Sequence, residues 1–216
     1  MSLRVVCFST YRTSVVGGWR REDYDAHDFV DAIKDRDVNQ YSHVRLRGKW
    51  HRFDNANRQD VVGWFAAMVS DYFAANPVDG PIRLVPVPGS KVDVKFAGLP
   101  RTAQLAHAIA AAVDDGVIVA DVLRQIKPIR SASEEGGTRD AAELFDNLVL
   151  TDKVGGFPVV LVDDVLTTGG HLQACAAKLR AAGADVLMAV VAGRADLAPV
   201  PDPFAQRSED VDDFEP

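Results

Sequence analysis

The sequence predicts an α/β fold: a parallel sheet flanked by helices, with an N-terminal lobe that would form a hood over it. From Ile82 onward, short apolar runs alternate with helical patterns, the order that produces parallel strands joined by right-handed crossovers. Residues 159–162 are aliphatic without alternation, as in a strand buried on both faces. Polar residues follow that run at once, and open α/β sheets bind ligands at the carboxyl ends of their strands.

Length and composition narrow the class of protein. The chain has 216 residues, of which 47% are hydrophobic, enough for one domain with an appended lobe. No apolar run approaches the roughly 20 residues of a membrane-spanning helix, and residues 1–10 show no signal-peptide pattern. We therefore expect a cytoplasmic protein without a membrane partner. The two cysteines are far apart in the sequence and predict neither a disulfide framework nor a metal site.

The net charge is concentrated at the C-terminus. It is −7 for the whole chain and −6 for residues 195–216, which leaves −1 for the remainder. The final segment is acidic and rich in proline, so we expect residues 196–216 to form a disordered tail. A body so close to neutral does not predict nonspecific affinity for nucleic acid, and we expect no nucleic-acid partner.

Residues 1–80 are expected to form the N-terminal lobe. Residues 3–8 fit a strand, and residues 24–33 fit a short helix with charged flanks. A longer helix is predicted from Asp60 to Ala75, with a broad apolar face that belongs to the core.

Between these helices, residues 43–53 alternate with period two, which predicts a single strand. Val44, Leu46 and Trp50 would lie on one side, with arginine and lysine side chains on the other. Two interpretations stay open. The segment is a hood strand whose cations meet substrate phosphates while Trp50 stacks on a base, or it is a solvent-exposed edge strand protected by its charges.

Residues 81–195 are expected to form the core. Its predicted elements, in order, are a strand over 82–87, a helix beginning near Pro100, a strand over 117–123, the strand that contains 159–162, a helix over 172–182 and a strand over 186–192. Gly183 is the expected residue just beyond the second of these helices.

The stretch after the aliphatic run combines an anion-binding pattern with an acidic one. Residues 167–170 are threonines and glycines that enter a helix, and such a loop suits a phosphate because the backbone can approach the anion closely. Asp163 and Asp164, just before it, would repel a phosphate and need a neutral polyol or a cation. A ribose 5-phosphate satisfies both requirements, because its 2′- and 3′-hydroxyls can donate hydrogen bonds to the carboxylates.

The run VVLVDDVLTTGG, residues 159–170, resembles the 5-phosphoribosyl-1-pyrophosphate (PRPP) motif of type I phosphoribosyltransferases. The resemblance implies the fold of that family and the transfer of a phosphoribosyl group from PRPP to an acceptor, with release of pyrophosphate. It implies Mg²⁺ as cofactor, bound through PRPP and pyrophosphate rather than by a protein metal site. The PRPP-binding residues that it implies are Asp163, Asp164, Val165, Leu166, Thr167, Thr168, Gly169, Gly170 and His171.

Two further segments gain roles from the same resemblance. Residues 86–91 look like the family's pyrophosphate loop, which would place Gly89, Ser90 and Lys91 on the pyrophosphate, although a lysine after a turn is also an ordinary solvated side chain. Residues 124–146 look like the flexible loop that closes over PRPP, although a mobile surface loop without a function stays open. The catalytic cations would be Lys91, Arg124, Lys127 and Arg139.

The chain also departs from the family. Thr167 stands where the 6-oxopurine branch has an aspartate, so the role of that aspartate is not transferred, and His171 stands where threonine or serine is usual. Residues 85–113 are similar to the ComF-like, competence-associated branch, although Lys95, Arg101 and Gln104 match it only loosely. The sequence therefore leaves open the identity of the acceptor and whether the protein forms a homodimer. Two other functions also stay open: a regulatory protein that senses PRPP or a nucleotide, and a ComF-like accessory protein of DNA uptake.

Overall fold

The structure is a computed structural model that describes residues 2–14, 17–89, 99–113, 116–128 and 140–214. The strands of its main sheet are β1 (Ser2–Cys7), β2 (Thr10–Arg12), β5 (Ile82–Pro86), β6 (Val117–Val119), β9 (Pro158–Leu166), β10 (Asp185–Asp196) and β11 (Arg207–Asp212). The helices are α1 (Arg21–Ile33), α2 (Asp60–Ala75), α3 (Arg101–Ala112), α4 (Ala141–Asp146) and α5 (Gly170–Ala181). Two smaller two-stranded sheets pair β3 (Ser42–Leu46) with β4 (Lys49–Phe53), and β7 (Leu123–Gln125) with β8 (Leu148–Leu150).

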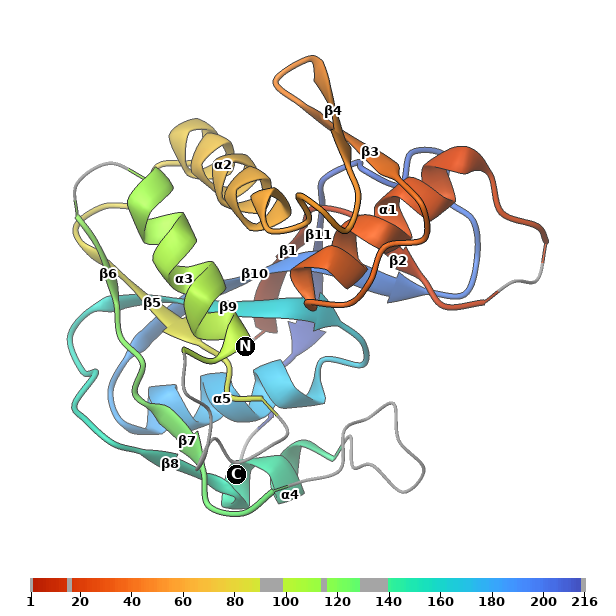
Figure 1. Cartoon of the computed structure of the whole chain (residues 1–216). Coiled ribbons are helices and arrows are strands. Elements are labelled where there is room, and N and C mark those ends of the chain that lie inside the picture. The colour runs from red at the N-terminus through yellow and green to blue at the C-terminus, as the bar shows by residue number, and fades with distance from the viewer. Residues whose placement is uncertain (1, 15–16, 90–98, 114–115, 129–139, 215–216) are drawn as a thin grey trace.

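The predicted α/β fold with a flanked, parallel sheet is confirmed (Figure 1). The strand order is β11-β1-β10-β9-β5-β6, with β2 as a further neighbour of β10, and β11 is the antiparallel strand among them. No described helix has the length and apolar character needed to cross a membrane.

Helices cover both faces of the sheet and bury two apolar clusters. Val160 and Val162 of β9 belong to the cluster under α1, α2 and α3, whereas Val159 and Leu161 belong to the cluster under α5 and α4. Since successive strand residues point to opposite faces, a strand between two helical layers needs apolar residues at every position. This requirement explains the unbroken aliphatic run that begins at residue 159.

The single strand predicted over residues 43–53 is wrong, because the chain reverses in the middle of it. Arg47 and Gly48 have φ values of 50° and 79°, and together they form the two-residue turn of the β3–β4 hairpin. The reversal places Trp50 opposite Arg45 rather than beside Val44. Val44 is buried, and Trp50 is 63% exposed.

The division of the chain expected from the sequence differs from the observed structure at both ends. Strands β1 and β2 pair in parallel with β10, so the start of the predicted N-terminal lobe belongs to the main sheet. The disordered tail expected over residues 196–216 is wrong for residues 207–212, which form β11 along the full length of β1. Backbone hydrogen bonds to β1 and burial of Val211 compensate for the acidic composition of this segment.

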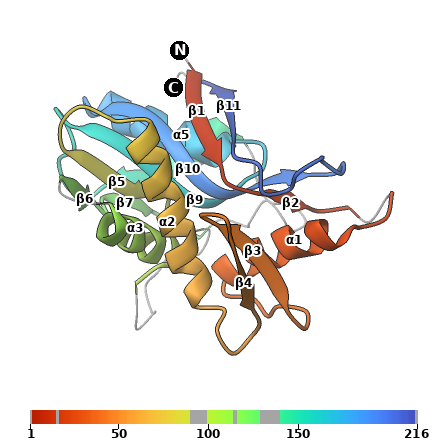
Figure 2. The same cartoon turned by 90° about the horizontal axis from the view of Figure 1, so that it is seen from above.

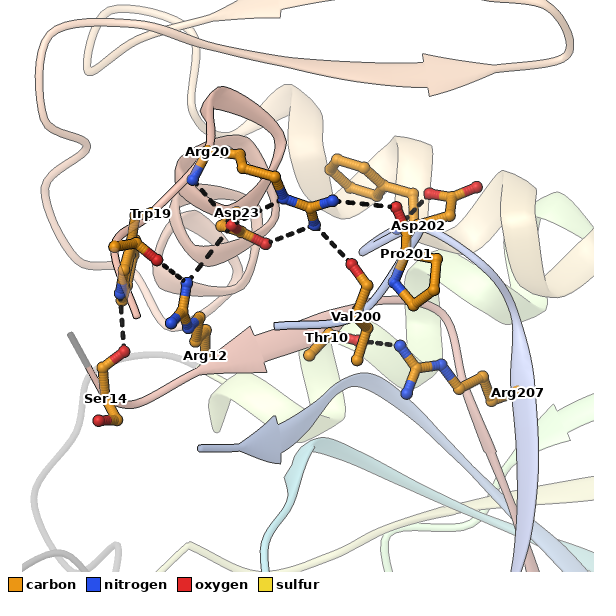
Figure 3. Close-up of polar contacts among 12 residues, drawn as sticks. Thr10, Arg12, Ser14, Trp19, Arg20, Asp23, Val200, Pro201, Asp202 and Arg207 are labelled. Atoms are coloured by element: carbon orange, nitrogen blue, oxygen red, sulfur yellow. Dashed lines mark hydrogen bonds and ion pairs between the residues drawn. The ribbon is translucent and has the colours of Figure 1, made fainter. Parts of the chain in front are cut away.

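A buried ion pair fastens the N-terminal segment together (Figure 3). Arg12 is 1% exposed and Asp23 is 3% exposed, with 3.4 Å between guanidinium Nη1 and carboxylate Oδ2. Asp23 also accepts from the main-chain nitrogen of Arg20 at 2.8 Å and from its Nη2 at 3.0 Å, and these hydrogen bonds lower the pKa of Asp23. The Arg20 guanidinium donates in turn to the carbonyls of Val200 and Pro201. The start of α1 is thereby tied to the connection between β10 and β11.

Replacement of Asp23 tests the importance of this buried pair. Asp23→Ala removes the carboxylate beside the buried Arg12 guanidinium, and we expect the free energy of unfolding to fall by about 3–5 kcal/mol in urea denaturation. Asp71→Ala is the control, because its pair with Arg47 is exposed and such pairs contribute little. Equal losses in the two variants would contradict the assignment.

Candidate functional site

Parallel neighbours β5 and β9 bring two of the predicted segments to one edge of the sheet. The main-chain nitrogen of Val87, just beyond β5, donates to the carbonyl of Val162 at 2.9 Å. Asp163 follows Val162 directly, and Gly89 is exposed two residues after Val87. The start of the predicted pyrophosphate loop and the acid pair therefore lie at the same edge.

The acid pair lies inside β9, which continues to Leu166. Because adjacent strand residues point to opposite faces, the two carboxyl groups have different neighbours. Asp164 forms an ion pair with Arg101, the first residue of α3. Asp163 lies on the α5 side, where its charge adds to the effect of burial in raising the pKa of the Cys175 thiol.

Burial and the neighbouring carboxylate make Asp163 hard to ionise. Burial is the larger cause and, with the charge of Asp164, raises the pKa of Asp163 to about 8. Two weaker effects lower this pKa. They are a 2.8 Å hydrogen bond donated by the Asp164 main-chain nitrogen and the positive charges of Lys34 and Arg101. Asp163 consequently holds its proton more tightly than an ordinary aspartate does in the ligand-free protein.

The threonine and glycine loop presents hydroxyls on a helix N-terminus. Thr167 and Thr168 are exposed, whereas Gly169 and Gly170 are buried. Gly170 is the first residue of α5, and Gly169 precedes it with a φ of 89°. Exposed donors above the positive end of a 12-residue helix form an arrangement that suits an anion.

The C-terminal strand supports this loop, which the sequence did not indicate. A Cβ atom at Gly169 would lie 2.6 Å from Cγ1 of Val211 in β11, so only glycine allows this approach. Arg194 donates through Nη1 to the carbonyl of Thr167 at 2.8 Å and through Nε to Glu209 at 3.0 Å. The loop is therefore held in place by contacts with β10 and β11.

His171 is the second residue of α5 and is neutral at neutral pH. Burial lowers the pKa of its imidazole to about 4, although the charge of Asp164 opposes the shift. Among the described residues, its Nε2 atom is buried without a hydrogen-bond partner. His171 can therefore contribute a neutral hydrogen-bonding group beside the loop, but not a positive charge.

The predicted catalytic loop begins as regular structure. Arg124 lies in β7, and its guanidinium is held by Asp121, with 2.9 Å between Nη2 and Oδ2. The backbone of Lys127 exchanges two hydrogen bonds with the amide side chain of Asn147, at 3.1 and 2.8 Å. Ser90, Lys91 and Arg139 lie outside the described residues.

Three residues that the sequence did not assign to the ribose site stand near the acid pair. Arg101 donates through Nη1 to the carbonyl of Lys34 at 3.4 Å, and Nζ of Lys34 lies 5.5 Å from the centre of the Tyr11 ring. Arg101 follows Pro100 at a helix start, a local pattern that could have indicated it. Lys34 and Tyr11 come from distant parts of the chain and carry no such signal.

Comparisons with known proteins add little to this geometry. No family model matches the chain, and no curated protein matches it. Among solved structures, it is similar to a hypoxanthine phosphoribosyltransferase from Staphylococcus aureus, at 11% identity over 66% of this chain and 70% of that one, with a TM-score of 0.42. It is also similar to a protein from Thermus thermophilus designated TT1426, at 16% identity over 67% of this chain and 85% of that one, with a TM-score of 0.33. Because both TM-scores are below 0.5, neither likeness carries an argument about function.

Gly169→Ala tests the support of the loop by β11. The substitution introduces a strained positive φ and a clash with Val211, so we expect the free energy of unfolding to fall by about 1–3 kcal/mol. Gly63→Ala in α2 is the control: a Cβ there meets nothing within 4 Å, and we expect a gain of about 0.5–1 kcal/mol. If urea denaturation shows a gain for both variants, the loop does not have this conformation.

Asp163→Asn tests the raised pKa through the pH dependence of stability. The folded state holds the Asp163 proton more tightly than the unfolded state, so the wild-type protein loses stability as pH rises from about 4 to about 8. Asparagine cannot ionise. We therefore expect the variant to have the higher melting temperature at pH ~8, with a difference that shrinks toward pH ~5.

Asp79→Asn, at an exposed turn, is the control for that experiment. Its melting temperature should follow the wild type at every pH. A constant difference between Asp163→Asn and the wild type across this range would show that Asp163 does not titrate in it.

Proposed function

We propose that the chain binds PRPP and transfers its 5-phosphoribosyl group to an acceptor with release of pyrophosphate. One observation carries this proposal: an acid pair in β9 is followed, after two connecting residues, by exposed threonines and buried glycines that open α5. The carboxylates can accept hydrogen bonds from sugar hydroxyls, and the loop beside them can donate hydrogen bonds to a phosphate. Together they match the two parts of a ribose 5-phosphate. The resemblance of residues 159–170 to the PRPP motif supports the same assignment.

The 5′-phosphate would lie over the N-terminus of α5. The Thr167 and Thr168 hydroxyls would donate to it, together with backbone N–H groups of the loop and the first turn of the helix. Val165 and Leu166 connect the acid pair to the loop, and Leu166 is buried, which fixes the connection. The residues proposed to contact the phosphate are Thr167, Thr168, Gly169, Gly170 and His171.

The ribose would lie beside Asp163 and Asp164, which accept from its hydroxyls. Asp164 already has Arg101 as a partner, so a ribose hydroxyl must share or displace that guanidinium. Asp163 accepts more strongly after it loses its proton, and ribose binding therefore favours its ionised form. Both effects make the acid pair responsive to the ligand.

Pyrophosphate would lie toward the end of β5. Gly89, Ser90 and Lys91 are the proposed contacts there, and Arg124, Lys127 and Arg139 are the proposed cations of a closing loop. Arg101 and Lys34 add positive charge on the same side as Asp164. These cations would stabilise the negative charge that grows on the leaving group while the ribose acquires oxocarbenium character.

Magnesium fits this set of residues without a dedicated protein site. Among the described residues, no group of three histidine, cysteine or acidic side chains could hold a metal ion. Mg²⁺ keeps several waters and takes phosphate oxygens, so PRPP itself would supply its ligands. When bound, the ion neutralises charge on the pyrophosphate.

A second candidate function is a regulatory protein that binds PRPP without turning it over. The observation that favours it is the Arg124 guanidinium, which is engaged by Asp121 instead of being free to meet a ligand. The two candidates share the ribose and phosphate contacts and differ in the release of pyrophosphate.

The double variant Asp163→Asn with Asp164→Asn tests the shared contacts. Each charge-assisted hydrogen bond contributes about 1.5–3 kcal/mol, so we expect at least a tenfold loss of affinity for PRPP with Mg²⁺ and for ribose 5-phosphate in calorimetry. Asp79→Asn, in the exposed turn before β5 and so at the opposite end of the parallel strands, should bind ribose 5-phosphate as the wild type does. Unchanged affinity in a folded double variant would remove the ribose assignment.

Release of pyrophosphate from PRPP on addition of a panel of nucleobases and other acceptors separates the two candidates. Turnover with any acceptor supports the transferase. Tight binding without turnover across the panel supports the regulatory protein.

A further inference from the structure

The β3–β4 hairpin projects from the body of the molecule on the side of α1 and α2 (Figures 1 and 2). Its inner face is anchored, because Val44 and Phe53 are fully buried in the core. Asp28 accepts a hydrogen bond from the Ser42 hydroxyl, and Asp25 accepts one from the His43 main-chain nitrogen at 2.9 Å. The hairpin is thus a fixed element with one face directed outward.

The outer face of the hairpin is defined by the cross-strand pairs Arg45–Trp50 and His43–Arg52. Directly paired residues in an antiparallel ribbon share a face, and these two pairs alternate with those that carry Val44 and Phe53. Arg45, Trp50 and Arg52 are exposed. A tryptophan that is 63% exposed on an anchored strand is an unusual surface residue for a protein without a partner there.

Aromatic rings and arginine side chains are neighbours along the outer face of the hairpin and at its Tyr41 end. The Tyr41 ring lies between two guanidinium groups, 4.8 Å from that of Arg21 and 4.7 Å from that of Arg52. His43 lies 5.5 Å from Tyr41 and 6.5 Å from Trp50, in both cases edge to face. The rings are therefore held in place.

The charge of the hairpin is uniformly positive. Residues 41–53 contain no acidic residue. Among the described residues, no carboxylate lies within ion-pair distance of Arg45 or Lys49, and Arg52 lies 3.7 Å from Asp54. Arg47 differs, because it points toward α2 and is held by Asp71 at 2.6 Å. The positive charge that is free to meet a ligand thus lies with the exposed rings.

We propose that the outer face of the hairpin binds single-stranded nucleic acid. Exposed rings stack on unpaired bases, and neighbouring cations meet the phosphates between them, the combination by which proteins bind single strands without regard to sequence. A duplex keeps its bases stacked inside and would leave the Trp50 ring unused. From Tyr41 to Arg45 the face spans about 14 Å, enough for a few nucleotides.

This proposal departs from the expectation drawn from net charge. The body of the chain carries only −1 overall, but residues 41–53 contain four arginine or lysine residues and no acidic one. Association with a polyanion depends on the local field, which a basic hairpin supplies even when the whole molecule is acidic.

Fluorescence anisotropy with end-labelled oligothymidine and oligouridine tests the proposal on the full chain. Contacts by Arg45 and Arg52, the two arginines of the outer face, predict that the logarithm of affinity falls with the logarithm of salt with a slope of about −1.4. Trp50→Ala should lower affinity about tenfold and leave that slope unchanged, because stacking releases no counterions. The polymer that binds more tightly identifies DNA or RNA as the natural class.

A pair of arginine variants provides the matched control. Arg45→Gln and Arg47→Gln remove the same charge from the same hairpin, on the outer face and on the α2 side respectively. We expect Arg45→Gln to reduce both the affinity and the steepness of the salt dependence, and Arg47→Gln to change affinity less than about twofold. The double variant at Asp163 and Asp164 should bind oligonucleotides normally, so the test is independent of the proposed PRPP site.

Four results would overturn the proposal. They are absence of binding to both oligonucleotides at low salt, equal effects of the two arginine variants, binding of polyglutamate as tight as that of the oligonucleotides, and binding of a nucleoside monophosphate as tight as that of either polymer. The third result would indicate an acidic protein partner. The fourth would indicate that the hairpin holds the acceptor of the proposed transferase.

Discussion

Two adjacent carboxyl groups in a buried strand impose the constraint on which the rest of the site depends. Their mutual repulsion and loss of hydration are relieved in two ways, by protonation of Asp163 and by the ion pair of Asp164 with Arg101. The second way requires the start of α3 to meet the end of β9. The carbonyl of Lys34 binds the same guanidinium, so the end of α1 is drawn to that point as well. The site is therefore formed jointly by the lobe and the core.

The conformation of the threonine and glycine loop depends on β11, a strand near the C-terminal end of the sequence. Val211 packs against Gly169, and Glu209 orients the Arg194 that holds the carbonyl of Thr167. A loop with two glycines has high conformational freedom, and a binding loop must lose that freedom before it can hold a phosphate well. The contacts with β11 restrict the conformational freedom of the loop before any ligand binds. Glu209 and Val211 thus have structural roles, although the composition of this segment is typical of disordered segments.

Acidic and basic residues are concentrated in different elements of the chain. Acidic side chains are frequent on α1 and in the C-terminal segment, where Asp23, Asp25, Glu209 and Asp213 accept hydrogen bonds from backbone or arginine groups. The hairpin carries the complementary excess of arginine and lysine on a projecting surface. The proposed transferase site and the proposed nucleic-acid surface consequently use different elements, joined through α1.

The sequence by itself determined the α/β class, strands β1, β5, β9 and β10, the helices around them and the threonine and glycine loop that opens α5. Each follows from local periodicity, buried apolar runs or turn chemistry, which act over a few neighbouring residues. The Arg47-Gly48 turn was also visible locally, but the period-two pattern on both sides concealed the reversal. Only the tertiary structure decided that β11 is a strand and that Arg101, Lys34 and Tyr11 meet near Asp164, because these contacts join residues far apart in the chain and their free energy comes from pairing and burial that no single segment contains.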